Sequence, residues 1–153
     1  MTTSGPLNAE EEHVWRALMR VCVALPRELH GDMSRAAGLL VNEYVTLMCL
    51  SEAPDRRLRM AALSMEVGLS PSRMTRVVDN LRIRGLIVKQ TCREDGRGSL
   101  AVLTDAGLST LLGAWPTHLR SVRTRAFDHI DPADLPAMAR VLTAIAAQLD
   151  RDV

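Results

Sequence analysis

Two short helical patterns separated by a single glycine narrow the choice of fold more than any other feature of this sequence. Residues 58–67 and 71–84 both carry apolar residues at helical spacing, and Gly68 interrupts the pattern between them. Pro71 suits the first turn of the second helix, because its fixed φ angle fits there and its missing N–H is not needed. Ser70 stands just before it, where a hydroxyl side chain can cap the helix. Two short helices joined by a glycine-containing turn predict a helix-turn-helix.

A glycine-rich hairpin pattern follows directly. Gly85 stands where the second helix must end, at a position that often takes the left-handed conformation open to glycine. Residues 86–91 and 99–103 are predicted to be short strands, and the connector 92–98 between them holds two glycines and alternating charges. A hairpin placed directly after a helix-turn-helix forms a wing. We therefore expect a mainly α fold with a small β-hairpin wing, a winged helix-turn-helix.

The composition also favours helices. Aromatic residues make up only 3% of the 153 residues, while hydrophobic residues make up 47% and charged residues 24%. A core of this composition is built from Leu, Val, Ala and Met on helices, whereas a sheet protein uses more aromatic and β-branched residues. A chain of this length has room for one domain, residues 1–153, and can bury a core without disulfides or metals.

A long apolar stripe predicts a helix near the N-terminus. This helix is expected to begin near Asn8, because three glutamates follow in its first turn, where the helix dipole favours negative charge. Pro26 is expected to bend it or end it early, and Gly31 to stop it. A further helix is predicted over 41–52, ending at the turn 53–55. The N-terminal stripe consists of Val14, Leu18, Val21, Cys22, Leu25 and Leu29.

The C-terminal third carries two more helical patterns. Thr104 is expected to cap a helix that kinks at Pro116 and continues towards Ile130. The last helix begins at either Asp131 or Asp134, and the pattern leaves both starts open. Because stripes this apolar at both chain ends do not suit the surface of a monomer, they predict a homodimer. The last stripe consists of Leu135, Met138, Leu142, Ile145, Ala146 and Leu149.

The net charge of +1 hides an uneven distribution. Residues 54–99 hold ten basic and five acidic residues, and the remainder holds nine basic and thirteen acidic residues, which together make the chain's 19 and 18. A basic middle between acidic flanks favours a polyanion partner such as double-stranded DNA. A solvated charged surface is the alternative, and charge alone does not decide between the two.

The outer face of the helix predicted at 71–84 is suited to reading DNA. Arginine offers a bidentate pair of donors to guanine, and hydroxyl side chains can contact bases or phosphates. The N-terminal end of a recognition helix leads into the major groove. The predicted buried face consists of Met74, Val77, Val78, Leu81 and Ile83. The outer face contains Asp79 and Arg82 and the candidate DNA contacts Ser70, Ser72, Arg73, Thr75, Arg76 and Asn80.

The predicted hairpin tip adds basic residues to the same module. Arg93 and Arg97 lie in the connector, and an arginine is favoured in a narrow minor groove because the potential there is strongly negative. Asp95 is expected to hold an arginine side chain in position for this contact. For the basic outer face of the helix predicted at 71–84, these two arginines favour a role in DNA binding over the alternative of a charged face exposed only to solvent.

At this point the sequence resembles the MarR family. The run Leu69–Leu81 (LSPSRMTRVVDNL), continued by Arg84–Ile87 (RGLI), resembles that family's recognition-helix signature. The tripeptide Asp95–Arg97 (DGR) and the run Val102–Gly107 (VLTDAG) resemble its wing and its Leu-Thr-x-x-Gly exit. One departure is that Gly98 follows the wing arginine, where the family often has a second arginine.

The resemblance implies a homodimeric transcriptional regulator, a repressor that binds a pseudo-palindromic operator. Helices in 10–30 and 108–150 would form the dimer, and residues 41–107 would form the winged lobe that binds DNA. The recognition helix would enter the major groove and the wing the minor groove. A small-molecule effector, where family members take one, lies in the cleft between these two regions. Here that cleft would be lined by Leu25, Met48 and His118.

Other functions find less support in the sequence. No phosphate-binding glycine loop or nucleophile motif predicts an enzyme. His118 and His129 lie ~16 Å apart along one helix, too far to share a metal ion, so neither a metal site nor a cofactor is expected. Some family members carry a peroxide-sensing thiol where Cys22 lies, but we expect Cys22 to be a small core residue. A winged helix used only for protein contacts is the alternative function, and it would show no salt-dependent DNA binding.

The sequence also bears on where the protein works. The N-terminus is polar and lacks the pattern of a signal peptide. No apolar run approaches the ~18 residues that a membrane span needs. We therefore expect a cytoplasmic protein with no membrane partner.

Overall fold

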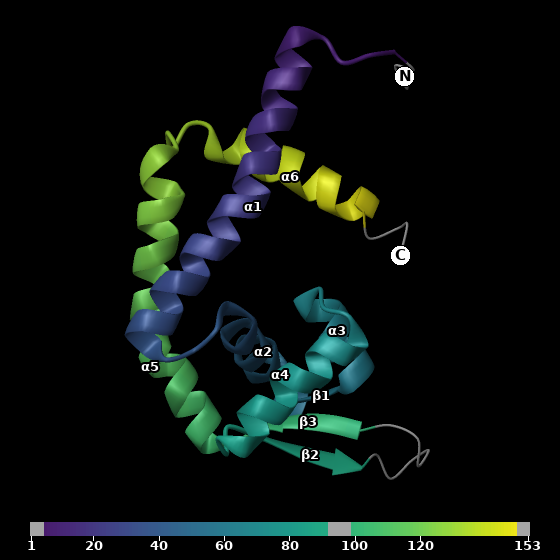
Figure 1. The fold of residues 1–153 in the computed structure, drawn as a ribbon, viewed down its shortest axis with the longest axis vertical. Coiled ribbons are helices and arrows are strands. Elements are labelled where there is room, and N and C mark those ends of the chain that lie inside the picture. Colours follow the sequence, from purple (N-terminus) through teal and green to yellow (C-terminus); the bar gives the residue numbers. More distant parts are fainter. Residues whose placement is uncertain (1–4, 92–98, 150–153) are drawn as a thin grey trace.

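The computed structural model describes residues 5–91 and 99–149. Two long helices, α1 (Ala9–Ala37) and α5 (Asp105–Arg125), pack against each other and extend away from a compact lobe (Figure 1). The last helix, α6 (Leu135–Leu149), lies at the end of these helices that is remote from the lobe. We call α1, α5 and α6 the arms, and the elements between α1 and α5 the winged lobe.

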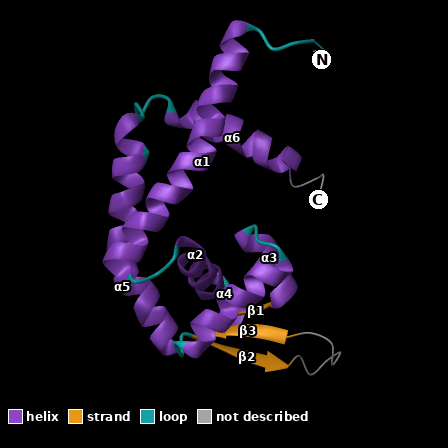
Figure 2. Ribbon diagram, viewed as in Figure 1, coloured by secondary structure: helices purple, strands orange, loops and turns teal. Residues whose placement is uncertain are grey.

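The winged lobe combines three helices with a small sheet (Figure 2). Its elements are α2 (Val41–Glu52), a 3₁₀ turn (Pro54–Arg56), β1 (Arg57–Arg59), α3 (Met60–Val67), α4 (Pro71–Ile83), β2 (Ile87–Thr91) and β3 (Ser99–Leu103). The helix-turn-helix and the two hairpin strands are therefore confirmed. A second 3₁₀ turn (Phe127–His129) leads from α5 towards α6.

The sheet has one strand more than the sequence predicts. It is antiparallel with the order β1-β3-β2, and β2 pairs with β3 from Ile87 opposite Leu103 to Thr91 opposite Ser99. The prediction of a helix beginning at residue 58 is wrong, because Leu58 lies in β1 and pairs with Ala101. Its two arginine neighbours are exposed while Leu58 turns inward, which is the alternation of a strand. Three residues are too few for this period to stand out from the helix that follows.

The core of the winged lobe surrounds α2. Helices α3, α4 and α5 and the strand β3 all pack against it. The fully buried side chains include Tyr44, Leu47, Leu50, Leu63, Met74, Val78, Leu81 and Ile87. Apart from one tyrosine this core is aliphatic, as the low aromatic content predicts.

Helix α1 begins as predicted. The Asn8 side chain accepts hydrogen bonds from the backbone N–H groups of Glu10 and Glu11, and the Glu11 carboxylate accepts one from Asn8 N–H. This reciprocal capping box fixes the first turn. The helix then passes through Pro26 without ending.

The predicted end of this helix at Gly31 is wrong. Helix α1 continues past Gly31 to Gly38, whose left-handed backbone (φ +62°) forms the cap. Contacts with α5 hold the additional turns, because Met33 is fully buried and Asp32 accepts a hydrogen bond from the Ser121 hydroxyl at 2.5 Å. The cost of one glycine inside a helix, about 1 kcal/mol, is smaller than what such contacts contribute.

The C-terminal helices differ slightly from expectation. Helix α5 is continuous through Pro116 but ends at Arg125, short of the predicted Ile130. Helix α6 takes the later of the two predicted starts, since the N–H of Met138 donates to the carbonyl oxygen of Asp134. No side chain of α6 is buried within the single chain. None of the helices in the described ranges is long and apolar enough to cross a membrane.

Candidate nucleic-acid interface

A glycine turn fixes how α4 leaves α3. Gly68 adopts the left-handed conformation (φ +69°), and its N–H donates to the Met65 carbonyl oxygen at 3.1 Å. The next N–H, from Leu69, donates to the Ser64 carbonyl oxygen at 2.9 Å. These bonds satisfy the free carbonyl groups at the end of α3. The turn therefore sets the angle between the two helices of the helix-turn-helix.

The opposite face of α4 is open. Every candidate DNA contact on this helix is exposed, namely Ser70, Ser72, Arg73, Thr75, Arg76 and Asn80. The predicted burial of Ile83 is wrong, since its side chain is 76% exposed. Ile83 follows the buried Leu81 by two residues, a step of about 200° around the helix that points it away from the core.

The hydroxyl groups near the start of α4 are arranged differently from the prediction. Ser70 occupies the N-cap position, but its side chain makes no capping hydrogen bond and instead lies 3.3 Å from the Ser72 hydroxyl. Thr75 donates its hydroxyl hydrogen to the Pro71 carbonyl oxygen at 2.9 Å. The N–H groups of the first turn therefore have no side-chain cap, and a phosphate oxygen could accept from them.

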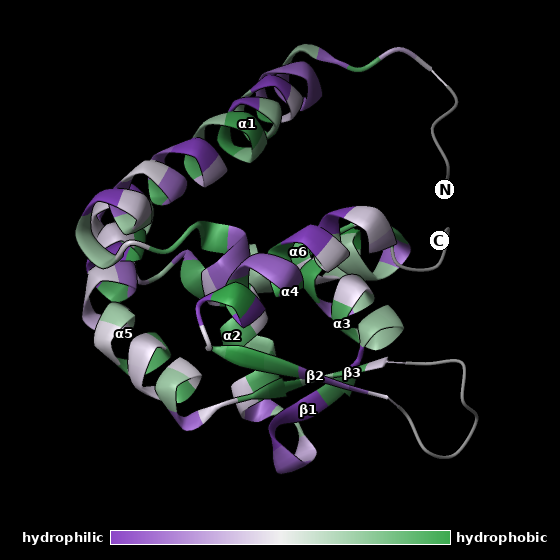
Figure 3. Cartoon of the chain, turned by 60° about the horizontal axis from the view of Figure 1, so that its bottom comes forward, coloured by the Kyte–Doolittle hydropathy of each residue, from purple (hydrophilic) through white to green (hydrophobic). Residues whose placement is uncertain are grey.

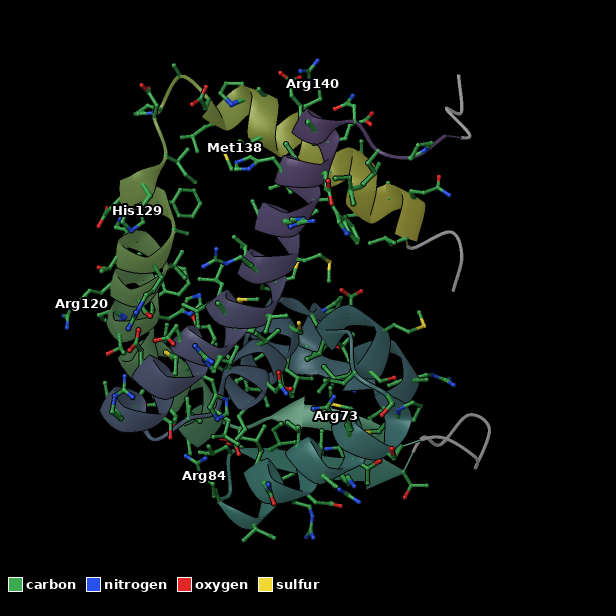
Figure 4. All side chains as sticks on the ribbon, turned by 45° about the horizontal axis from the view of Figure 1, so that its top comes forward. Arg73, Arg84, Arg120, His129, Met138 and Arg140 are labelled. Atoms are coloured by element: carbon green, nitrogen blue, oxygen red, sulfur yellow. The ribbon has the colours of Figure 1, made fainter. Side chains whose placement is uncertain are left out.

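Arg73 and Arg76 are the charged groups best placed for a partner. Neither guanidinium forms an ion pair or side-chain hydrogen bond within the residues that the structure describes, and both side chains are exposed. Arg73 projects from the winged lobe, well away from the arms (Figure 4). Two unpaired guanidinium groups on the N-terminal half of an exposed helix suit an anionic partner with hydrogen-bond acceptors.

Asp79 has a structural role that the sequence does not reveal. The helical pattern places it on the outer face, yet Asp79 accepts a hydrogen bond from the Lys89 ammonium group at 2.8 Å. This bond, with a smaller effect of Arg82, holds the pKa of Asp79 below its ordinary value. The pair joins α4 to β2 and orients the hairpin relative to the helix. Its only sequence signal is two opposite charges ten residues apart.

The corner after α4 is joined to α5 by Thr104. Gly85 turns the chain in the left-handed conformation (φ +73°). The Thr104 hydroxyl donates to the carbonyl oxygens of Gly85 at 2.8 Å and Leu86 at 3.0 Å, and accepts from the N–H of Gly107 at 3.0 Å. A Cβ atom at Gly107 would overlap the Leu86 carbonyl oxygen. The predicted cap at Thr104 is confirmed, and the same residue links the end of α4 to α5.

The predicted wing contacts Arg93, Asp95 and Arg97 lie outside the described residues. The strands β2 and β3 that lead to them are described, and their pairing extends to Thr91 and Ser99. The roles given to these three side chains therefore stay predictions.

The three residues predicted to line an effector cleft occupy different surroundings. Leu25 lines a groove of about 760 Å³ between α1, the end of α5 and α6, and neither Met48 nor His118 belongs to that lining. Met48 packs partly buried against the core. His118 stacks on Tyr44, with ring centroids 4.4 Å apart.

The stacked pair carries polar atoms without partners. The Tyr44 hydroxyl oxygen and His118 Nδ1 are buried, and neither has a hydrogen-bond partner among the described residues. Burial lowers the pKa of His118, and burial, followed by the charge of Glu52, raises the pKa of Tyr44. Both side chains are therefore neutral near pH 7.

The two cysteines within the described residues lie in different environments. The prediction that Cys22 is a core residue is wrong for the single chain, where it is exposed on α1. Of its apolar stripe, Val14 and Val21 are exposed as well, whereas Leu18, Leu25 and Leu29 are partly buried. Cys49 lies partly buried against the core, and burial is the main reason that its pKa is raised.

The chain is similar in sequence and fold to transcriptional regulators. Residues 37–98 match the family model described as the MarR family. Sco3205, a MarR family transcriptional regulator from Streptomyces coelicolor solved in complex with DNA, is 32% identical, with 95% of this chain and 91% of that chain covered and a TM-score of 0.88. AbsC, a MarR family transcriptional regulator from the same organism, is 33% identical, with 96% and 99% covered and a TM-score of 0.87.

More distant structures share the fold. CouR from Rhodococcus jostii RHA1, solved bound to p-coumaroyl-CoA, is 24% identical, with 92% of this chain and 96% of that chain covered and a TM-score of 0.75. No curated protein matches the chain. The similarity to Sco3205 and AbsC covers the arms as well as the winged lobe, because it extends over nearly the whole chain.

Proposed function

Because this chain belongs to the MarR family of transcriptional regulators, we propose that it is a cytoplasmic homodimeric repressor that reads a pseudo-palindromic site on double-stranded DNA. The observation that carries the proposal is the exposed, unpaired state of Arg73 and Arg76 on α4 within the described residues. Guanidinium groups near the N-terminal end of a recognition helix can reach guanine edges in the major groove. The complex of Sco3205 with DNA supports DNA as the partner of this chain.

The proposed wing contact adds a second element on the same face. Arg97 enters the minor groove next to the recognition helix, Asp95 fixes its direction, and Arg93 contributes charge. The excess of basic residues over 54–99 supports this arrangement, because phosphate contacts supply most of the affinity for any duplex. Ser70, Ser72, Thr75 and Asn80 complete the proposed DNA-contacting set.

A second copy of this chain is the proposed partner of the arms. The hydropathy colouring shows hydrophobic residues recurring along α1 between hydrophilic ones (Figure 3). The exposed large hydrophobic residues of the arms include Val14, Trp15, Met19, Val21, Val23, Leu135, Met138, Val141, Leu142, Ile145 and Leu149. The groove of about 760 Å³ between α1, α5 and α6 is lined by the same kind of side chain, including Phe127. Helices from a second copy would fill the groove and cover both stripes, with dimer helices in 10–30 and 108–150 and a winged lobe over 41–107.

A small-molecule effector is proposed to act between the arms and the winged lobe. Met48 on α2 and His118 on α5 come from two helices that pack against each other there, whereas Leu25 lines the groove between α1, α5 and α6. The buried, unpartnered polar atoms of Tyr44 and His118 support a polar ligand group at this place, because each has an unused hydrogen-bonding site. Binding there would change the angle between arms and lobe and release the DNA.

The test is selection of DNA by the purified wild-type protein from a pool of random duplexes. The expected result is an inverted pair of half-sites about one helical turn apart, bound with an affinity that falls as salt rises. Arg73→Ala and Arg76→Ala are each expected to weaken binding to the selected duplex by about 1–3 kcal/mol and to relax the preference at one base position per half-site.

Arg120→Ala is the charge-matched control. Arg120 is exposed on α5, remote from Arg73 (Figure 4), so its loss is expected to leave the affinity unchanged. A wild-type protein that selects no sequence and binds no duplex, at low or high salt, is a module for protein contacts only. Unchanged base preference in both variants would show that a different face reads the bases.

A further inference from the structure

One ion pair joins the C-terminal end of α4 to the ends of two other helices. Arg84, which caps α4, donates from Nη1 to Glu43 Oε2 at 3.1 Å, and from Nη2 to the Gly38 carbonyl oxygen at 3.3 Å. Gly38 is the left-handed cap of α1, and Glu43 lies in the first turn of α2. The guanidinium therefore contacts residues 41 and 46 positions away in the sequence.

The Glu43 side chain is buried in the winged lobe. It is only 6% exposed, whereas that of Arg84 is 39% exposed. The Glu43 oxygen that pairs with Arg84 also accepts the N–H of Leu40 at 3.0 Å, which caps the start of α2. Arg84 is the only ion-pair partner of Glu43 among the described residues. Its loss would leave a buried carboxylate without a counter-charge, and the pair is therefore held firmly.

The pair lies at one of the two places where the arms join the winged lobe. Residues 38–40 connect α1 to α2, and Thr104 connects β3 to α5. Arg84 is bonded to the first connection, and its neighbour Gly85 is bonded to the second through Thr104. Figure 4 shows Arg84 at the base of the arms. Helices α1 and α5 are thus both bonded to the same corner of the lobe, at the end of the recognition helix.

We propose that Glu43 and Arg84 are positioning residues that fix the angle between α1 and α4, and thereby set the spacing of the half-sites that the dimer accepts. This inference rests on the proposed function as a DNA-binding homodimer. In such a dimer the arms are fixed to the partner, so the direction of α4 relative to α1 determines where the two recognition helices stand. The distance between half-sites on DNA mirrors that separation.

A direct phosphate contact is the competing role for Arg84. Both of its terminal nitrogens already donate within the chain, and its partner Glu43 is buried. The two roles predict opposite behaviour of Glu43. A positioning pair needs the carboxylate, whereas a phosphate-binding arginine is freed for DNA when the carboxylate is neutralised.

The experiment compares Glu43→Gln, Arg84→Gln and the double variant with wild type. The probes are a duplex selected by the wild-type protein from a random pool, and the same duplex with one base pair added or removed between its half-sites. A glutamine at 43 can still accept the Leu40 N–H, so α2 keeps its cap. Arg82→Gln is the matched control, because Arg82 lies on the same helical turn but pairs with Asp79 within α4, at 3.6 Å.

The wild type is expected to prefer the selected spacing. The spacing preference is measured as the affinity for the selected duplex divided by the affinity for a duplex with altered spacing. Each single variant is expected to reduce this ratio by about twofold or more. The double variant is expected to reduce it no further, because the two residues act in one network. The base preference within a half-site, the dependence of affinity on salt and the sedimentation of the dimer stay as in wild type. Arg82→Gln is expected to keep the wild-type spacing preference.

Two results overturn the proposal. One is an unchanged spacing preference in both Glu43→Gln and Arg84→Gln when both variants are folded. If Glu43→Gln unfolds below the assay temperature, an unchanged spacing preference in Arg84→Gln alone overturns the proposal. The other is a loss of affinity in Arg84→Gln that is equal at all spacings and flattens the salt dependence by about one counterion per half-site. A wild type that selects no paired half-sites overturns the proposed function itself, and this inference with it.

Discussion

A side chain at position 107 would collide with the winged lobe. Gly107 lies in the first turn of α5, where the helix packs directly on the backbone of the corner after α4. A Cβ atom there would overlap the Leu86 carbonyl oxygen and a methyl group of Leu103. The glycine of the Leu-Thr-x-x-Gly run is thus required by close approach of two backbones rather than by its φ angle.

Gly107→Ala is expected to lower the free energy of unfolding by about 1–3 kcal/mol, because overpacking forces the backbone to shift. Gly113→Ala is the matched control in the same helix, since a Cβ atom there meets nothing within 4 Å. It is expected to stabilise the protein by up to about 1 kcal/mol through its higher helix propensity. Urea unfolding measures both, and equal effects of the two substitutions would contradict the close approach.

At the level of helices and strands, the contact between α2 and α5 depends on pH. Burial lowers the pKa of His118, which stacks on Tyr44 across these two helices. The unfolded chain therefore binds a proton more readily than the folded one. The stabilisation is complete above the ordinary histidine pKa of about 6.5 and declines as the pH falls below it.

His118→Phe keeps a stacked ring and removes this titration. Between about pH 7.5 and pH 5.5 the free energy of unfolding of the wild type is expected to fall more than that of the variant. Only in the wild type does folding at the lower pH require the side chain at position 118 to release a proton. Urea unfolding at the two pH values measures the difference. Equal losses in both proteins would assign the acid sensitivity to other groups.

Elements with their own start and stop signals could be predicted from the sequence. Asn8, Pro71 and Thr104 mark helix starts, and Gly68 and Gly85 adopt the left-handed conformation where the sequence predicts an end. The exposed face of α4 also followed from its spacing, because three of its side chains are fully buried on the other side.

Elements defined by distant contacts could not be predicted. The strand β1 exists because residues 57–59 pair with β3, more than forty residues later. The last turns of α1 depend on Asp32 meeting Ser121 and Arg125 of α5. Cys22 is exposed because nothing in the described part of the chain covers its position on α1. In each case the outcome depends on which distant part of the chain lies against the residue, and the neighbouring sequence does not carry that information.

At the level of the whole molecule, the arms of a single chain leave many apolar side chains exposed. Met138 and Leu142 of α6 line the groove shared with α1 and α5, while Arg140 does not (Figure 4). Leu142→Glu is expected to yield monomers at micromolar concentration, because a carboxylate would have to be buried at the proposed interface. Analytical ultracentrifugation measures the change, and DNA affinity is expected to fall with it.

Arg140→Glu is the control for that substitution. It introduces the same side chain two residues away, about 200° around the helix from Leu142, and is expected to remain a dimer. Dimeric Leu142→Glu at wild-type affinity for DNA would show that α6 does not form the interface. Monomeric wild-type protein would contradict the homodimer altogether.

Helix α6 buries no side chain within the single chain. The proposed control of transcription therefore depends on how much of the protein a cell contains. A helix of 15 residues that buries no side chain within its own chain is marginal in water, so α6 is expected to gain order when two chains meet in the proposed dimer. Chains below the concentration at which they associate are expected to expose this apolar segment and to be degraded by proteases. In the proposed dimer, occupancy of the DNA site then rises more steeply than in proportion to protein concentration, which gives gene control a threshold without any added component.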